Sequence, residues 1–265
     1  MLAGCGRPSQ NAPKASRQPA ALDVYVPCML SSPIQKVVAR FQQSHPGIEI
    51  STLVDKPLAQ IAQVQSAGNS AGVAITLGEI EMESLVTAGA VRPGDTRPFA
   101  VNTYPIVAVA PAASAQQQAS SLRELASPRV RRIFIEDPTL SSLGDRATRG
   151  LQKAGLWSAV SSKVVRPKPD AMILAELLDG KADAAIVFKG CLFAEKGIGG
   201  AIPKTIRLIG ELPVDSYPPM TYQAASLAKT TSPELARQFV DFLTSAEGRT
   251  ALTDAGLTPP AAGSP

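Results

Sequence analysis

The sequence has little of what catalytic and metal-binding proteins need. Of 265 residues, one is histidine and three are cysteine, and aromatic residues make up 5%. His45 lies in the turn-like sequence Ser44-His45-Pro46-Gly47, so we expect it in a surface loop rather than as a catalytic base. No Cys-x-x-Cys pair indicates a zinc or redox site. No Gly-x-Ser-x-Gly, Walker or Rossmann motif is found either, so we do not expect an enzyme.

Charge is also sparse, at 18% of residues with a net charge of +4. The one dense basic run is Arg129, Arg131 and Arg132, just before the apolar Ile133-Phe134-Ile135. Such a run is typical of a solvated turn that enters a strand, so nucleic acid is not an expected partner. No apolar stretch approaches the roughly 18 residues of a membrane-spanning helix. The 45% of hydrophobic residues suffices for one large or two modest cores.

The first residues, Met1-Leu2-Ala3-Gly4-Cys5, are typical of the end of a lipoprotein signal. We therefore expect lipidation at Cys5 and a location in the periplasm or on the outer cell surface, held to the membrane by the lipid. Only four residues precede Cys5, which we interpret as a start placed downstream of the true one or as a trimmed leader. Residues 1–5 would be the signal remnant, and Gly6 to Ala21, rich in proline and polar residues, a flexible tether. The alternative is a chance sequence in a cytosolic protein.

After residue 21 the chain alternates between two hydrophobic patterns. Apolar or alternating runs typical of strands cover residues 23–26, 48–53, 73–77, 106–110, 133–135 and 184–188. Patterns typical of helices cover residues 33–43, 57–65, 121–126, 145–154 and 171–178. This alternation predicts an α/β fold with mostly parallel sheets and helices on both faces. In such sheets, ligands bind beyond the carboxyl ends of the strands, where helix N-termini also point.

Several predicted helices begin directly after a strand. Unpaired backbone N–H groups at such ends attract anions without a cationic side chain. The pattern therefore indicates an oxyanion site, with ordinary helix capping as the alternative. The helix starts are Ser31-Ser32-Pro33, Asp55-Lys56-Pro57, Ser141-Ser142-Leu143-Gly144 and Pro169-Asp170.

Further motifs are spread over nearly the whole chain. They include Phe41 to Gly47, Leu58 to Ile61, Glu136-Asp137-Pro138 followed by Gly144, Ala154 to Trp157, Gly180 to Ala184, Tyr217-Pro218-Pro219, and Phe239 to Gly248 with Gly256 to Pro260. In these motifs the chain resembles the periplasmic molybdate- and tungstate-binding proteins of ABC transporters, which are two-lobed solute-binding proteins. The resemblance implies a monomer that binds a small inorganic ligand and delivers it to a membrane permease.

The resemblance also implies the architecture. Two α/β lobes would be joined by two crossover strands, near residues 102–106 and 219–222. Lobe one would comprise residues 22–104 plus 222–260, lobe two residues 105–221, and residues 261–265 a disordered tail. A hinge would let the lobes close on the ligand.

In the family, two serines, the N–H groups of an alanine and a valine, and a tyrosine hydroxyl hold the oxyanion. The matching positions in this sequence are Met29, Asp55, Leu143, Asp170 and Phe188. Every hydroxyl donor is replaced, whereas backbone donors at Leu143 and Asp170 do not depend on the side chain. An ionised Asp55 would repel a dianion. A shift of one or two residues would place Lys56 or Thr52 there instead. Our leading expectation is an oxyanion held mainly by backbone N–H groups.

Two cysteines fall in the same predicted cleft and leave alternatives open. Cys28, Met29, Asp55 and Cys191 supply thiolate, thioether and carboxylate ligands for a soft or borderline metal ion. Cys28 and Cys191 could instead form a disulfide that freezes the hinge, as in a sensor without a transport role, or be inert buried residues. No other cofactor is implied.

Overall fold

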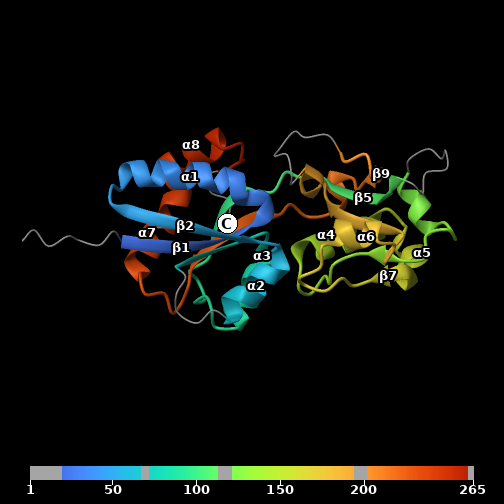
Figure 1. The fold of residues 1–265 in the computed structure, drawn as a ribbon, viewed down its shortest axis with the longest axis horizontal. Coiled ribbons are helices and arrows are strands. Elements are labelled where there is room, and N and C mark those ends of the chain that lie inside the picture. Colours follow the sequence, from blue (N-terminus) through green and yellow to red (C-terminus); the bar gives the residue numbers. More distant parts are fainter. Residues whose placement is uncertain (1–19, 67–71, 113–120, 194–201, 262–265) are drawn as a thin grey trace, which may run out of the picture.

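The computed structural model describes residues 20–66, 72–112, 121–193 and 202–261, and Figure 1 shows two lobes side by side. Each lobe is built on one five-stranded sheet. The predicted lipidation site Cys5 and the predicted tether up to residue 19 lie outside the described residues. Ala20 and Ala21, predicted as the end of the tether, instead open the first strand, where Ala20 pairs with Ile48.

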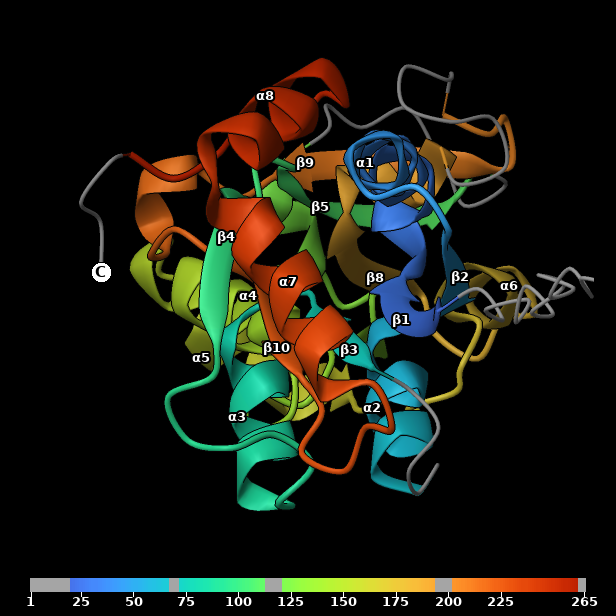
Figure 2. The ribbon, with the colours of Figure 1, turned by 90° about the vertical axis from the view of Figure 1, so that its left-hand side faces the viewer.

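The first lobe contains the sheet β2-β1-β3-β10-β4. Its strands are β1 (Ala20–Pro27), β2 (Ile48–Asp55), β3 (Val73–Thr76), β4 (Arg97–Val101) and β10 (Thr221–Ser226). The helices are α1 (Ser31–Ser44), α2 (Pro57–Ser66), α3 (Glu79–Thr87), α7 (Pro233–Thr244) and α8 (Ala246–Asp254). Figure 2 shows α1, α7 and α8 above or in front of the sheet and α2 and α3 at its lower side. The sheet is therefore covered on both faces.

The second lobe contains the sheet β7-β6-β8-β5-β9. Its strands are β5 (Ile106–Pro111), β6 (Ile133–Phe134), β7 (Val164–Val165), β8 (Ala184–Phe188) and β9 (Ile206–Glu211). The helices are α4 (Ser142–Lys153), α5 (Trp157–Val160) and α6 (Ile173–Leu178). Short 3₁₀ turns join these elements in both lobes: η1 (Cys28–Leu30), η3 (Leu122–Ala126), η4 (Ser161–Lys163), η5 (Lys189–Phe193) and η6 (Val214–Ser216).

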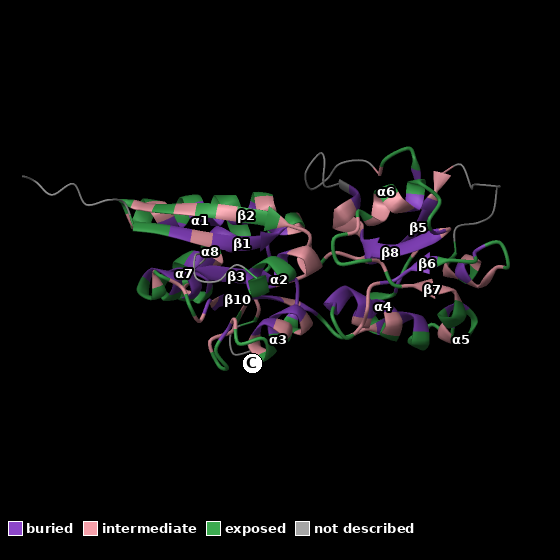
Figure 3. Ribbon diagram, turned by 60° about the horizontal axis from the view of Figure 1, so that its bottom comes forward, coloured by how far each residue is buried: buried purple, intermediate pink, exposed green. Residues whose placement is uncertain are grey.

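The central strands of each sheet are buried, and Figure 3 draws them in purple. Their side chains alternate between the two faces of the sheet, and helices cover both faces. Val24 and Val26 of β1 pack toward α1, whereas Tyr25 packs toward α2 and α3. In β5, Val107 faces the layer of α6 while Ala108 belongs to the core beneath α4. This burial explains why these strands are almost wholly apolar.

The two-lobed α/β fold is thus confirmed, with sheets that mix directions. β1 runs parallel to β2 and β3, while β10 is antiparallel to both its neighbours. In the second sheet, β5 is likewise antiparallel to β8 and β9. The chain passes between the sheets at residues 102–105 and 212–220. The Asn102 N–H donates to the Met220 carbonyl at 2.8 Å, so the two connections lie against each other.

Of two predicted helix starts in the second lobe, the one at residues 141–144 is confirmed and the one at residues 169–171 is wrong. α4 begins at Ser142, ahead of the helical pattern at residues 145–154, because Ser141 caps it by accepting a hydrogen bond from the Gly144 N–H. α6 begins at Ile173, later than the predicted start at 169–171, because the Ala171 N–H bonds the Lys168 carbonyl in a tight turn. In the described part of the chain, every helix is too short or too polar to cross a membrane.

Candidate functional site

The lobes meet at a surface that we call the lobe interface, formed by Lys56 and Glu81 of the first lobe and Ser142 and Asp170 of the second. The Lys56 ammonium donates to the Asp170 carbonyl at 2.8 Å. The Glu81 carboxylate accepts a hydrogen bond from the Ser142 N–H at 2.9 Å. Figure 1 shows α3 and α4 next to each other where the lobes meet. Both contacts join residues more than 60 positions apart, so they depend on how the lobes are placed.

Asp55 is the last residue of β2, half-buried beside the first turn of α2. Its carboxylate accepts hydrogen bonds from the Lys56 N–H at 2.7 Å and from the Gln63 amide at 2.5 Å. The start of α2 therefore already has an anionic partner. Lys56, the neighbouring residue, carries the cation that reaches the other lobe.

Leu143 lies in the first turn of α4, and its side chain is in the core. The N–H groups on either side are taken: Ser142 donates to Glu81 and Gly144 to the Ser141 hydroxyl. Within the described ranges, no acceptor contacts the Leu143 N–H. One donor at the positive end of this helix is thus left for a ligand.

Asp170 and Phe188, both matched to ligand-binding positions of the family, do not lie as predicted. Asp170 is exposed in a turn that precedes α6, so its N–H is not part of a helix N-terminus. Its carbonyl, an acceptor, faces Lys56 instead. Phe188 ends β8 and is 2% exposed within the core, so its ring packs against protein rather than lining open space. Neither residue offers a side-chain donor to an oxyanion.

Sulfur atoms gather at the ends of β1 and β8. Cys28 is exposed in η1, Cys191 is half-buried in η5, and both thiols are free, so the disulfide that the sequence left open as an alternative is not formed in this structure. Burial, and then the nearby Cys28 and Glu136, raise the pKa of Cys191 to about 12. Met29, next to Cys28, is half-buried against the core. Among the described residues, no three His, Cys, Asp or Glu side chains form a metal-binding cluster.

A buried tyrosine lies beside Cys191. Tyr222 is 0% exposed, and its hydroxyl has no hydrogen-bond partner in the described part of the chain. Burial raises its pKa well above the ordinary value, and the charges of Tyr104 and Cys191 add to this shift. A buried hydroxyl without a partner costs about 1–3 kcal/mol, so its persistence favours a group that it can bind.

Two carboxyl groups lie close enough to interact, Glu81 in α3 and Glu136. Burial raises the pKa of Glu81 to about 7, although hydrogen bonds from Ser142 oppose the shift. Burial likewise raises the pKa of Glu136, whose carboxylate accepts a hydrogen bond from the Ser141 hydroxyl. Glu136 in turn acts on both Glu81 and Cys191. A negative charge on Glu136 therefore disfavours ionisation of both of these groups.

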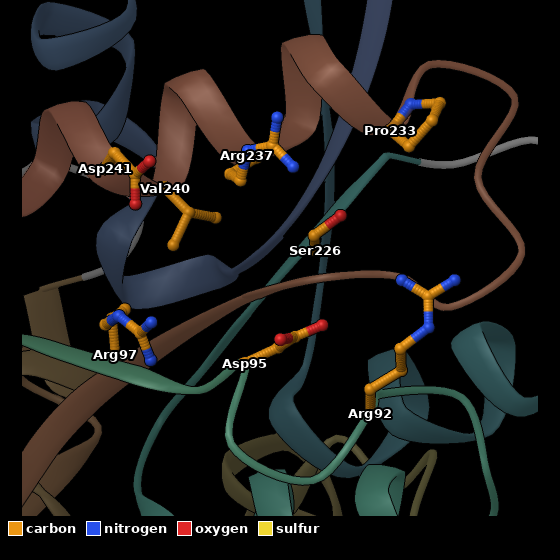
Figure 4. Close-up of a pocket in the computed structure, with 8 residues that line it drawn as sticks. All are labelled: Arg92, Asp95, Arg97, Ser226, Pro233, Arg237, Val240 and Asp241. Atoms are coloured by element: carbon orange, nitrogen blue, oxygen red, sulfur yellow. The ribbon is translucent and has the colours of Figure 1, made fainter.

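The linings of two cavities include none of the residues matched to the family site. One, of about 580 Å³, lies beside α3 and is lined by Gln65, Ile80, Glu83, Ser84, Thr87, Ala88, Pro138 and Thr139. The other, of about 220 Å³, lies between α7 and the approach to β4, where Figure 4 shows arginine and aspartate side chains around it. Its arginines already have partners: Arg92 and Arg97 donate to backbone carbonyls, and Arg237 pairs with Glu234. Neither cavity is the matched site.

A family model described as bacterial extracellular solute-binding protein matches residues 22–258. The chain belongs to this family. ModA of Mycobacterium tuberculosis H37Rv, named a molybdate-binding protein, is 26% identical over 98% of this chain and 93% of its own. YvgL of Bacillus subtilis, whose name describes an ABC transporter substrate-binding lipoprotein, is 22% identical over 97% and 93%. The named relatives are transport proteins rather than enzymes.

A solved structure shows the same fold. The periplasmic molybdate-binding protein of Azotobacter vinelandii superimposes on this solute-binding protein with a TM-score of 0.62 and 19% identity, covering 90% of this chain and 99% of the other. At this identity the likeness establishes the fold and not the ligand. The family supports a small solute, an extracytoplasmic location and a permease with its ATPase as partners.

Sequence reasoning missed Glu81 as a residue of the site and treated Lys56 only as an alternative. Glu81 follows Glu79 in the first turn of α3, where acidic residues are common because they oppose the helix dipole. No local signal separates such a residue from one that reaches another lobe. Lys56 has a signal, its place directly after a strand and before Pro57 at a helix start.

Proposed function

We propose that this solute-binding protein captures a molybdate- or tungstate-like oxyanion between its lobes and delivers it to an ABC permease. The observation that carries the ligand assignment is the Leu143 N–H, which has no partner among the described residues at the positive end of α4. The Lys56 ammonium adds a positive charge from the opposite lobe. The named molybdate-binding relative, matched over nearly the whole chain, supports the same ligand class.

The proposal includes the attachment of the protein. Lipidation of Cys5 would hold the protein to the outer face of a membrane, and residues 6–19 would act as the tether that lets it reach its permease. Labelling with a radioactive or clickable fatty acid in cells tests this. Incorporation that disappears in Cys5→Ser supports the anchor, and equal incorporation in the variant rules it out.

A thermal-shift series on the purified chain with Cys5→Ser tests the ligand. Molybdate, tungstate and sulfate are compared with Cu(I) and Ni(II), each at several concentrations. A ligand that binds only the folded state raises the melting temperature in proportion to the logarithm of its concentration. Stabilisation by molybdate or tungstate supports the oxyanion. Stabilisation by a cation alone would end that assignment and leave the importer role in place.

The sulfur atoms favour a second candidate, a soft metal ion. Cys28 and Cys191 are close enough for the charge of one to raise the pKa of the other, and Met29 adds a thioether. Thiolate and thioether select Cu(I) among the common metals. Because both thiols have raised pKa values, metal binding would release protons. Titration of the reduced protein with Cu(I) in weak buffer, compared with Cys28→Ser/Cys191→Ser, measures this release, and equal release from both proteins excludes the site.

A further inference from the structure

The N-terminus of α4 already holds an anion that comes from the other lobe. Glu81 in α3 is 0% exposed, and its carboxylate accepts hydrogen bonds from the Ser142 N–H at 2.9 Å and from the Ser142 hydroxyl at 2.5 Å. Ser142 is the first residue of α4, so its N–H has no acceptor within the helix. A carboxylate at this position is favoured by the partial positive charge of the helix end.

Neighbouring groups fix the same contact. The Ile80 N–H donates to the Ser142 hydroxyl oxygen at 3.2 Å. One turn further along α4, the Arg146 guanidinium pairs with Glu79 and donates to the Pro219 carbonyl at 3.2 Å. The Arg146 side chain is 5% exposed, so this ion pair is shielded from solvent on one side. The first turn of α3 is therefore bonded to the first two turns of α4.

Gly78 lets the two helices approach this closely. A Cβ atom there would lie 2.3 Å from the Ser142 hydroxyl oxygen and 2.9 Å from the Met220 sulfur. The Gly78 backbone is extended, with φ of −161°, so its conformation does not demand glycine. Space alone requires it. Met220 belongs to the second connection between the lobes, which places the contact beside the hinge.

We propose that Glu81 is an internal ligand that occupies the anion-binding end of α4 from the opposite lobe and holds the lobes together before any solute binds. A negatively charged solute then meets lobes that are already in contact, and it competes with Glu81 for the N-terminus of α4. The solute keeps the adjacent Leu143 N–H as a donor. The lobe contact made by Glu81 does not depend on which solute binds. The experiment below measures this contact in the solute-free protein, so its outcome is independent of the proposed ligand.

Small-angle X-ray scattering of the solute-free protein tests the proposal. Glu81→Ala removes the carboxylate, and we expect a larger radius of gyration than in the wild type. Glu81→Gln keeps an acceptor for the Ser142 N–H and a donor for its hydroxyl, and we expect the wild-type value. Glu83→Ala, at an exposed position of the same helix, is the matched control and should also leave the value unchanged.

A wild-type radius of gyration for folded Glu81→Ala would overturn the proposal, as would equal expansion of the Glu83→Ala control. If Glu81→Ala does not fold, Ser142→Ala replaces it, because this variant removes one of the two hydrogen bonds and leaves no charge without a partner. We then expect a smaller expansion. A Ser142→Ala protein that scatters like the wild type contradicts the proposal in that case.

Discussion

The Lys56 ammonium donates a hydrogen bond to the Asp170 carbonyl across the lobe interface, at 2.8 Å. Asp170 was matched to a backbone donor of the family site, yet the structure presents its acceptor oxygen there. Lys56 is thus the group at this edge that carries a donor and a positive charge. The edge can attract an anion through this side chain even though the helix expected at residue 170 begins only at Ile173.

Lys56→Gln should weaken oxyanion binding. The variant keeps a hydrogen-bond donor and removes one positive charge at a partly solvated site, where a charge pair is worth about 1–2 kcal/mol. We expect about a tenfold rise in the dissociation constant for molybdate, measured by isothermal titration calorimetry. Lys36→Gln, exposed on α1, is the control and should bind like the wild type. Equal affinities for all three proteins would remove Lys56 from the site.

Asp55→Asn separates the two candidate ligands by the sign of its effect. The side-chain oxygen still accepts from the Lys56 N–H, while the negative charge at the end of β2 disappears. A dianion a few ångströms away should bind at least tenfold more tightly, because several kcal/mol of repulsion at intermediate dielectric are removed. A cation should instead bind more weakly, because the same change removes a negative charge that attracts it. The control is Glu49→Gln, because Glu49 is exposed on the same strand. If Asp55→Asn binds a ligand with unchanged affinity, residue 55 does not face that ligand.

The alternation of strands and helices was predictable because it is local. The apolar runs at 73–76, 106–110 and 184–188 are buried on both faces, and such strands have a clear signature. The late start of α6 was not predictable from the same pattern. The Ala171 N–H bonds the Lys168 carbonyl in a turn, so the helix does not begin at Ala171. The two prolines at 167 and 169 also keep the residues before them out of the helical conformation.

The lobe interface was predictable only in part. The positions of Asp55 and Leu143 follow from motif spacing, since each lies at a strand end or helix start. The Glu81–Ser142 contact joins residues 61 positions apart and needs the lobes to be placed within hydrogen-bond distance. Burial of the Tyr222 hydroxyl without a partner likewise depends on packing around it. Such features come from tertiary structure, which hydrophobic periodicity does not encode.

The two cysteines at the interface should differ in reactivity. Cys28 is exposed, whereas Cys191 is less accessible and has a pKa raised to about 12, so its thiolate is scarce at neutral pH. In a Cys5→Ser background at pH 8, we expect iodoacetamide to modify Cys28 first, as followed by mass spectrometry of peptides. Denatured protein serves as the control, since both thiols should then react at similar rates. Faster modification of Cys191 in the folded protein would contradict the described burial.

The raised pKa of Glu81 should appear as a pH dependence of stability. The native carboxyl, with a pKa of about 7, binds a proton more tightly than the ordinary value of 4.5. Between these values the native state holds more protons than the unfolded state, so the free energy of unfolding falls as pH rises from 4.5 to 7. The shift corresponds to about 3 kcal/mol in total. Above pH 7 this contribution becomes constant.

Urea unfolding at several pH values, compared between the wild type and Glu81→Gln, measures this contribution. The variant cannot ionise, so its free energy of unfolding should fall less between pH 5 and 8 than that of the wild type. Glu136 remains in both proteins, as do the neighbouring charges Glu79, Asp145 and Arg146, so the slope common to both profiles belongs to these groups. The difference between the profiles measures Glu81 together with its electrostatic coupling to Glu136. Glu83→Gln should keep the wild-type slope, because Glu83 is exposed. Parallel pH profiles for wild type and Glu81→Gln would show that Glu81 ionises normally, and its burial against Ser142 would then not hold in solution.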